Sequence, residues 1–387
     1  MFTRRGLLLG VGTVVAVGCA TPPAVQQASI APSYDPASRA DAIARKLHAD
    51  FPTPALSVAV ARVDGIVWAQ AYGRADIEFD VAATPRHSFK LGSVSKVITA
   101  TAAARMAARG ELDLDAPISR WLPELPEHHR ATTLRQLLTH RGGVRHYNGR
   151  DLNAAQPGGL PDARTYATTA TILALFIDDP LVAEPGSKSI YSTYGYTLAS
   201  LAMEAAVGQP FLDLVAREVS TPFALGSLQP DDPISLRAGR VSGYGPARDY
   251  SRTYPLAKEG WVNVRQVNPA YKWAGGGFVA TPSDIARFGA GHLDGGQMSP
   301  AMRDLLFTVL VERSPNSPPL GLGWRVDEDP KGRRRWHHAG NQEGGRASLV
   351  VYPDLGLSIA LATNVVSTPG DTLTPSANLA DAFTHAE

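Results

Sequence analysis

A serine and a lysine three residues apart, Ser93 and Lys96, are the first residues whose types and spacing could do chemistry. They precede strong helix formers that continue to a glycine at position 110, which predicts a helix starting at the serine. Residues three apart share a helix face, so the lysine amine can reach the serine hydroxyl. The lysine accepts a proton from serine only if burial or neighbouring cations lower its pKa. In isolation, the pair is more typical of a helix cap followed by a solvated lysine.

Two further motifs lie downstream of this pair. The stretch EPGSKSIYSTYGYTL places Tyr191 and Thr193 after a Pro-Gly turn and before a predicted helix. A tyrosine can act as an acid or base near neutral pH if flanking cations favour its phenolate, and Lys96 is the natural candidate. The stretch WHHAGNQ places His338-Ala339-Gly340 at the end of one predicted strand and ahead of another. The glycine there leaves room for a substrate beside the strand.

Taken in order, these three motifs resemble those of the serine β-lactamase and penicillin-binding protein superfamily, whose first motif is Ser-x-x-Lys opening a helix. The stretches LRQLLTHRGGV (134–144) and AGGGFVATPSDIARF (274–288) extend the resemblance. Order and spacing are most similar to the class C β-lactamase branch, which includes D-aminopeptidases, D-alanyl-D-alanine carboxypeptidases and family VIII esterases. The resemblance covers residues 40–364.

The resemblance implies a role for each motif residue. Ser93 would be the acylated nucleophile, Lys96 its proton acceptor, and Tyr191 a second acid/base that protonates the leaving group and later activates water. The backbone N–H groups of Ser93 and Asn341 would form the oxyanion hole, which contributes a large share of acyl-transfer catalysis. The substrate-binding residues would be His338, Gly340 and Thr193.

Two departures from the family pattern bear on the substrate. The second motif is usually Tyr-x-Asn, but Thr193 keeps only a hydroxyl and cannot offer both an amide donor and a carbonyl acceptor. The third motif is usually Lys-Thr-Gly in true class C β-lactamases, whereas His338 stands here in place of the lysine. A neutral imidazole is a weaker anchor for a substrate carboxylate, so strong cephalosporinase activity is not expected.

Composition excludes several other classes. The chain has 387 residues, 44% hydrophobic and 19% charged, with a net charge of +1, so neither nucleic acid nor a charged membrane surface is an expected partner. The histidines lack the spacing of a metal site and there is no cysteine pair, so we expect no metal and no cofactor. The α/β-hydrolase elbow Gly-x-Ser-x-Gly is absent from the sequence.

The N-terminal stretch MFTRRGLLLGVGTVVAVGCA predicts export. Residues 1–19 have a basic start resembling a twin-arginine signal and an apolar run too short to span a bilayer. Cys19, the only cysteine, lies where a bacterial lipobox would place it, so lipidation would anchor a periplasmic protein to the membrane. A plain secretory signal with an incidental cysteine is the alternative. Residues 20–38 are rich in Pro, Ala and Ser and are expected to form a flexible linker.

The periodicity of the remaining chain predicts one hydrolase domain, 39–387. Apolar, β-branched runs predict a hairpin around Asp64-Gly65, strands at 321–326 and 334–338, and a strand pair within 345–364. Between these ends helical patterns dominate, at 94–109, 133–138, 170–177, 195–207, 211–218 and 282–293. We therefore expect an α/β (α+β) fold of the β-lactamase/transpeptidase type, with an antiparallel sheet from both chain ends (39–99 and 275–387) and a mainly helical insertion (100–274).

The sequence thus predicts a serine hydrolase that forms an acyl-enzyme on Ser93. Small esters, D-amino-acid amides or peptides are the expected substrates, with slow turnover of β-lactams. The alternative is a non-catalytic envelope protein that keeps the fold to bind peptidoglycan or a protein partner, although intact Ser93, Lys96 and Tyr191 favour an enzyme.

Overall fold

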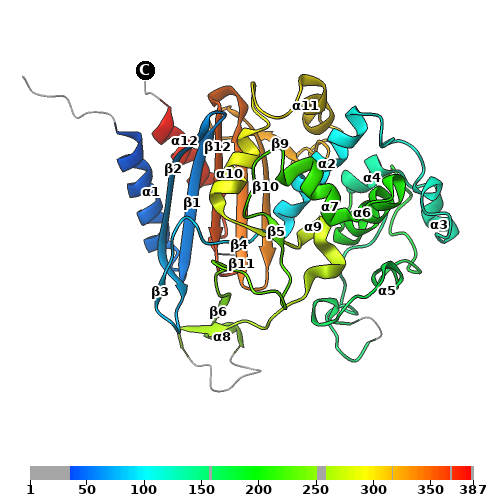
Figure 1. Cartoon of the computed structure of the whole chain (residues 1–387), viewed down its shortest axis with the longest axis horizontal. Coiled ribbons are helices and arrows are strands. Elements are labelled where there is room, and N and C mark those ends of the chain that lie inside the picture. Colours follow the sequence, from blue (N-terminus) through cyan, green and yellow to red (C-terminus); the bar gives the residue numbers. More distant parts are fainter. Residues whose placement is uncertain (1–34, 157–158, 251–258, 316, 367, 385–387) are drawn as a thin grey trace, which may run out of the picture. The chain divides into compact units, whose positions relative to one another are not determined.

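A seven-stranded antiparallel sheet forms the centre of the computed structural model, in the order β3-β2-β1-β12-β11-β10-β9 (Figure 1). The structure describes residues 35–156, 159–250, 259–315, 317–366 and 368–384. The strands of this sheet are β1 (Ala55–Arg62), β2 (Gly65–Asp76), β3 (Val81–Ala82), β9 (Arg325–Glu328), β10 (Arg334–Gln342), β11 (Gly345–Tyr352) and β12 (Leu357–Thr363). The expected antiparallel sheet built from both ends of the chain is confirmed.

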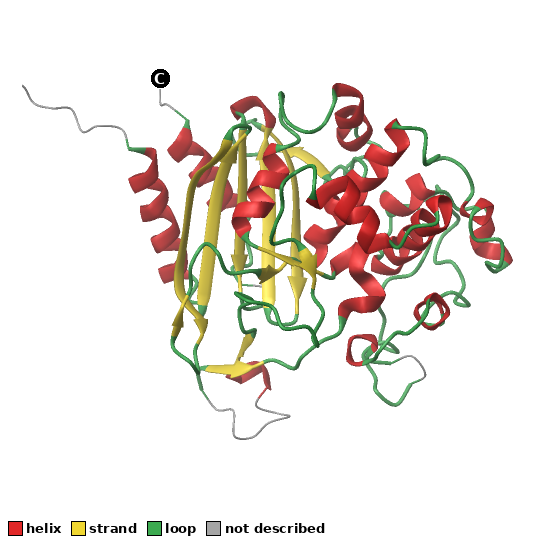
Figure 2. Ribbon diagram, viewed as in Figure 1, coloured by secondary structure: helices red, strands yellow, loops and turns green. Residues whose placement is uncertain are grey.

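Alternation of side chains explains why helices cover both faces of the sheet. Along β1, Leu56, Val58 and Val60 belong to one apolar cluster, which also contains residues of α1 (Pro36–Asp50) and α12 (Leu373–Phe383). The alternate alanines of β1 belong to a second, larger cluster on the opposite face. Figure 2 shows helices on both sides of the strands. Burial on both faces accounts for the nearly continuous apolar sequence of the central strands.

Small residues let α10 (Pro282–Ala290) lie close to the face opposite α1 and α12. This helix packs across β1 and β12. A side chain at Gly289 would collide with the Ser358 hydroxyl and would lie 2.8 Å from Leu349 Cδ1. The helix can therefore approach the sheet only because this position lacks a Cβ atom.

The helical region continues from the sheet toward the side opposite α1 in Figure 1. Its central helix, α2 (Ser95–Ala108), is buried around almost its whole circumference, which explains its short, apolar side chains. The other helices are α3 (Glu127–Arg130), α4 (Leu134–Leu138), α5 (Thr169–Leu173), α6 (Thr193–Val207), α7 (Phe211–Val215), α8 (Ala247–Tyr250), α9 (Trp273–Gly276) and α11 (Pro300–Phe307). Two small sheets consist of β4 (Phe89–Lys90), β8 (Phe278–Ala280) and β5 (Gln229–Pro230), and of β6 (Tyr244–Pro246) and β7 (Trp261–Asn263).

Most predicted elements occur, and three of their boundaries are each shifted by four residues. The strand predicted to end at His338 continues to Gln342, because it pairs with β11 along its whole length. The strand predicted at 321–326 begins only at Arg325, since Gly321 and Trp324 are joined in a turn and Gly323 has a positive φ. The helix predicted at 170–177 ends at Leu173, and the residues that follow turn into the core.

The described residues show neither a single membrane-spanning helix nor a cluster of metal ligands. No individual helix there combines the length and apolarity needed to cross a membrane; Thr193–Val207 and Phe211–Ser220 meet the criteria only as a pair bent by 85°. The same residues contain no group of three or more histidine, cysteine or acidic side chains that could hold a metal ion.

Candidate active site

Ser93 lies in a short 3₁₀ turn, Gly92–Val94, immediately before α2. Gly92 has a φ of +49°, and a Cβ atom there would lie 2.7 Å from the backbone nitrogen and oxygen of Asn341. Conversely, a side chain at Gly340 would collide with Leu91 O and Ser93 N. Two glycines therefore allow strand β10 to lie directly against the turn that carries Ser93.

Strand β10 has different neighbours on one of its edges before and after His337. Strand β9 pairs with β10 only from Arg334 to His337, and beyond this point β10 lies against the Gly92–Val94 turn. The motif residues His338, Gly340 and Asn341 all lie in this second part of the strand. The structure thus brings the first and third motifs together, as the sequence predicts.

Lys96 is fully buried one helical turn from Ser93. Its Nζ lies 3.4 Å from Ser93 Oγ, 3.2 Å from Thr193 Oγ1 and 2.5 Å from Gly275 O. Burial lowers the pKa of Lys96, and the Arg325 guanidinium acts in the same direction, whereas Tyr191 opposes the shift. The surrounding groups thus favour the neutral amine that a proton acceptor must be.

Tyr191 reaches the same serine from a different element. Its hydroxyl oxygen lies 2.6 Å from Ser93 Oγ, and Lys96 Nζ lies 4.8 Å from the centre of its ring. Burial acts to raise the pKa of Tyr191. The charge that Lys96 carries when it is protonated, the hydrogen bonds to Lys96 and Ser93, and the charge of Arg325 outweigh burial, so that the pKa is lowered. This is the condition for a tyrosine to act as an acid/base.

A buried histidine, His140, and a partly buried one, His146, hold the Tyr191–Thr193 segment in place. His140 Nδ1 accepts the backbone N–H of Ser192, and His146 Nδ1 accepts that of Thr193, each at 3.2 Å. The ring of His140 also packs at 4.4 Å from that of Tyr191. Burial lowers the pKa of His146 to about 4 and that of His140 well below its usual range, so both remain neutral acceptors. Both imidazoles thus hold the backbone of this segment, which is a structural role of the kind that the sequence analysis favoured for these histidines.

A cavity of about 370 Å³ opens beside the tyrosine. His338 lines it, and burial lowers the pKa of this histidine well below its usual range. Arg325, which sequence reasoning missed, lines the cavity too, and its guanidinium makes no ion pair or hydrogen bond with the described residues. Arg325 thus brings a positive charge to the cavity that His338 also lines. The complete lining is His140, Ser189, Tyr191, Ser314, Ser317, Leu320, Arg325 and His338.

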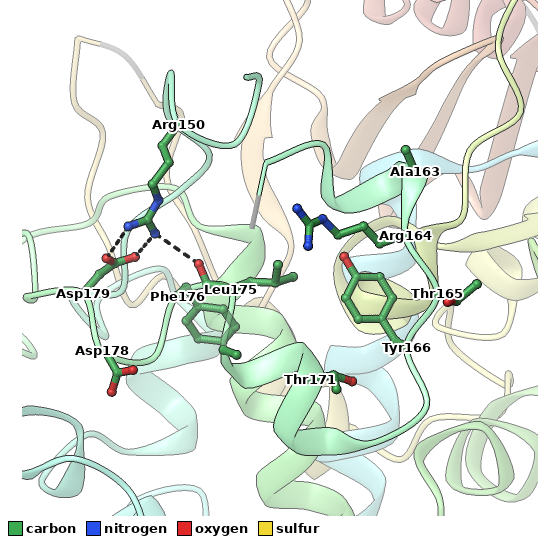
Figure 3. A pocket seen from close by; sticks show the side chains of 11 residues that line it. Arg150, Ala163, Arg164, Thr165, Tyr166, Thr171, Leu175, Phe176, Asp178 and Asp179 are labelled. Carbon is green, nitrogen blue, oxygen red and sulfur yellow. Dashed lines mark hydrogen bonds and ion pairs between the residues drawn. The ribbon is translucent and has the colours of Figure 1, made fainter. Parts of the chain in front are cut away.

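A larger cavity, of about 820 Å³, lies elsewhere in the helical region (Figure 3). Arg150 at its rim is paired with Asp179 at 2.6 Å and donates a hydrogen bond to Leu175 O. None of the residues predicted for catalysis lines it. The smaller cavity, which contains Tyr191, is therefore the candidate reaction site.

Comparison with known proteins identifies the family. A family model described as Beta-lactamase matches residues 40–382. The chain belongs to this family. Among curated β-lactamase-related proteins, Esterase EstB of Burkholderia gladioli is 29% identical over 79% of this chain and 84% of its own length. The serine beta-lactamase-like protein LACTB, mitochondrial, of Homo sapiens is 28% identical over 63% of this chain, and the chain spans only 54% of that relative.

Solved structures confirm the β-lactamase/penicillin-binding protein fold. The D-amino acid amidase from Ochrobactrum anthropi superposes with a TM-score of 0.74 at 20% identity, covering 89% of this chain and 97% of that one. The penicillin-binding protein from Bacillus halodurans gives a TM-score of 0.73 at 20% identity, covering 88% of this chain and 98% of that one. The predicted membership and fold are thus confirmed, and the relatives support the prediction that the chain is a serine hydrolase.

Proposed function

We propose that the protein hydrolyses small esters, or D-amino-acid amides or peptides, through an acyl-enzyme on Ser93. The observation that carries the proposal is the position of Ser93 Oγ, which lies within reach of both Lys96 Nζ and Tyr191 Oη, at 3.4 and 2.6 Å. Relatives named as an esterase and as a putative D-alanyl-D-alanine carboxypeptidase support this substrate range.

The proposed reaction has two steps. Ser93 Oγ attacks the substrate carbonyl carbon while its proton passes to Lys96, and Tyr191 protonates the departing group. Water then attacks the acyl-enzyme, with Tyr191 accepting its proton, and the bond between Ser93 Oγ and the acyl carbon breaks while Lys96 returns its proton to Ser93 Oγ. Thr193 would position Lys96, which contacts its hydroxyl at 3.2 Å.

The N–H groups of Ser93 and Asn341 would stabilise the oxyanion of each tetrahedral intermediate. The close approach of Gly92 and Gly340 places the backbone of Asn341 beside the serine turn, which supports this assignment. Asn341 Oδ1 accepts a hydrogen bond from Arg346 at 2.8 Å, which holds the Asn341 side chain in place. His338 would help to shape the substrate-binding cavity but would add no charge to it, because its imidazole is neutral.

Arg325 favours substrates whose leaving group carries a carboxylate. Its guanidinium lines the cavity that contains Tyr191, the proposed proton donor to the leaving group. Guanidinium groups bind carboxylates in a planar, two-point geometry. A peptide with a free C-terminal carboxylate fits this arrangement better than a neutral alcohol ester does.

Ester turnover and acylation test the function together. The purified protein would be incubated with p-nitrophenyl butyrate and with a fluorescent penicillin, alongside Ser93→Ala and the matched control Ser95→Ala. Ser95 is two residues away, buried, and contacts the Phe278 N–H. We expect Ser93→Ala to lose at least about 10³-fold in turnover and all labelling, whereas Ser95→Ala keeps both. A wild-type protein that neither turns over nor acylates would support the peptidoglycan- or protein-binding alternative.

A second comparison tests the carboxylate. An N-acetyl-D-Ala-D-Ala dipeptide and its C-terminal amide differ only in the charge that Arg325 would bind. We expect the wild type to prefer the acid and Arg325→Gln to lose most of that preference. Equal hydrolysis of both by the wild type would leave neutral esters as the better substrate class.

Export and membrane anchoring are proposed from the sequence alone, since Cys19 lies outside the described residues. The apolar run and lipobox-like position of Cys19 support lipidation. Metabolic labelling with a radioactive fatty acid should mark the wild type and not Cys19→Ala. A labelled Cys19→Ala protein, or an unlabelled wild type, would contradict the anchor.

A further inference from the structure

Lys272 is a second cation near Ser93 that the proposed reaction does not use. It ends a 3₁₀ turn, Pro269–Lys272, directly before α9, and is partly buried. A Cβ atom at Gly276 would lie 3.8 Å from Lys272 Cδ and 3.7 Å from the carbonyl carbon of Gly92. The lysine side chain and the turn that carries Ser93 therefore both lie against Gly276.

The ammonium of Lys272 rests on aromatic rings instead of a carboxylate. Its Nζ lies 5.8 Å from the ring centre of Tyr147 and 5.4 Å from that of Tyr271. It makes no ion pair or hydrogen bond with the described residues. Aromatic faces attract a cation but do not neutralise it, so the charge remains available to an anion from outside the chain.

The two acidic groups whose charges act on Lys272, Asp162 and Asp231, lie close to other cations. Asp162 binds Arg265 with both carboxylate oxygens, each at 2.9 Å. Asp231 lies 3.9 Å from Lys90 and 3.6 Å from Arg240. A partly buried cation without its own partner is costly unless an anion binds it.

Lys272 does not line the cavity that contains Tyr191 and Arg325, which the leaving group would face. It reaches the centre from the Thr193 side instead: the Tyr147 ring beneath it packs at 4.4 Å from His146, whose Nδ1 accepts the Thr193 N–H. At this point Thr193 replaces the amide that the family pattern would place there.

We propose that Lys272, supported by Tyr147 and Tyr271, binds a negatively charged group on the acyl part of the substrate. The preferred acyl group then carries a carboxylate a few bonds from its carbonyl carbon. This inference rests on the proposed acyl-enzyme at Ser93. Lys272 acts as a specificity-determining residue, since it selects the acyl group and takes no part in bond making.

A pair of esters of equal length isolates this charge. The mono-4-nitrophenyl ester of adipic acid and 4-nitrophenyl hexanoate share the leaving group and the six-carbon acyl chain, and differ only in the terminal carboxylate. The measured quantity is the ratio of their kcat/KM values, after subtraction of the Ser93→Ala background. A loss of activity that a substitution causes equally for both substrates cancels in this ratio.

We expect the wild type to favour the adipate ester by about tenfold or more, mainly through KM. Lys272→Met should lower the ratio about tenfold, Lys272→Arg should retain most of it, and the control Lys46→Met, on the exposed side of α1, should leave it unchanged. A wild-type ratio near one, or a ratio that Lys272→Met does not lower, would overturn the inference and leave the Ser93 function intact. Absence of Ser93-dependent turnover of either ester would overturn both.

The pH dependence of the ratio supplies an independent readout. Burial together with the nearby Lys96 and Lys90 lowers the pKa of Lys272 to about 8. Because kcat/KM reports the free enzyme, the preference for the adipate ester should fall as pH rises through about 8. In Lys272→Arg it should persist, and a wild-type preference that stays constant to pH 10 would contradict the assignment. The charged and titratable groups around Lys272 are Asp162, Asp231, Lys90, Lys96, Tyr147 and Tyr271.

Discussion

The hydroxyl oxygen of Tyr191 lies 2.6 Å from that of Ser93, although 98 positions separate the two residues. Tyr191 lies two residues before the start of α6, and Ser93 lies two residues before the start of α2. Both helices pack against α9, which supplies the Gly275 carbonyl to Lys96 between them. The relative position of the two hydroxyls is thus fixed by helix packing rather than by a local turn.

Removal of the Tyr191 hydroxyl should slow both steps of the reaction. General acid–base groups typically contribute about 10²–10⁴-fold, so kcat for p-nitrophenyl butyrate should fall by that factor in Tyr191→Phe. If Tyr191 activates the hydrolytic water, a β-lactam acyl-enzyme should also persist longer, which intact-protein mass spectrometry measures over time. Tyr196→Phe is the matched control, because the Tyr196 hydroxyl donates to Leu138 O and its ring also lies near Lys96. Equal rates in the two variants would exclude Tyr191 as the acid/base.

Replacement of Arg325 should move the acidic limb of the pH–rate profile. Rate rises with pH as the Lys96–Tyr191 pair loses a proton, and Arg325 lowers the pKa of both partners. In Arg325→Gln these pKa values should rise, shifting the limb of kcat/KM upward by roughly 0.5–1 pH unit. A neutral ester is the substrate of choice, since it does not depend on carboxylate binding. Arg325→Lys should have the same acidic limb as the wild type. An unshifted limb in Arg325→Gln would show that the Arg325 charge does not influence the pKa values of Lys96 and Tyr191.

A single methyl group at Gly340 should separate β10 from the serine turn. The added Cβ would collide with Leu91 O and Ser93 N, which are backbone atoms and cannot rotate away. We expect Gly340→Ala to lose more than about 10²-fold in activity, because it displaces the oxyanion donors, and to lose about 1–3 kcal/mol of stability. Gly226→Ala, where nothing lies within 4 Å of the new atom, is the control for urea unfolding and ester turnover.

His292 should make the protein sensitive to acid. It is buried between the Thr101 hydroxyl, at 3.0 Å from its Nε2, and Phe288 O, at 2.8 Å from its Nδ1, and burial lowers its pKa to about 3. The unfolded chain then binds a proton more readily than the folded one, so the stability from this group is complete above about pH 6.5 and falls as pH drops toward 3. Urea midpoints measured from pH 7 to pH 4 should fall less steeply in His292→Gln than in the wild type, with the partly exposed His48→Gln as control. Parallel curves would contradict this source of acid sensitivity.

Several features were predictable from local sequence. The three-residue spacing of Ser93 and Lys96 on a helix face follows from helix geometry alone. The short apolar runs of β1 and β12 predict strands, and the turn between β11 and β12 indicates an antiparallel pair. The order of the three motifs identified the family, which the match over residues 40–382 confirms.

Other features depend on contacts between distant segments. Arg325 and Lys272 belong to no motif, and nothing in their local sequence shows that both lie near Ser93. The lowered pKa of Lys96 likewise requires its burial among α2, α6 and α9, because desolvation depends on the surrounding atoms and not on neighbours in the chain. The sequence by itself therefore determined the fold and predicted the groups that we propose to react, whereas only the tertiary structure decided which charges surround them, because those charges come from distant segments of the chain.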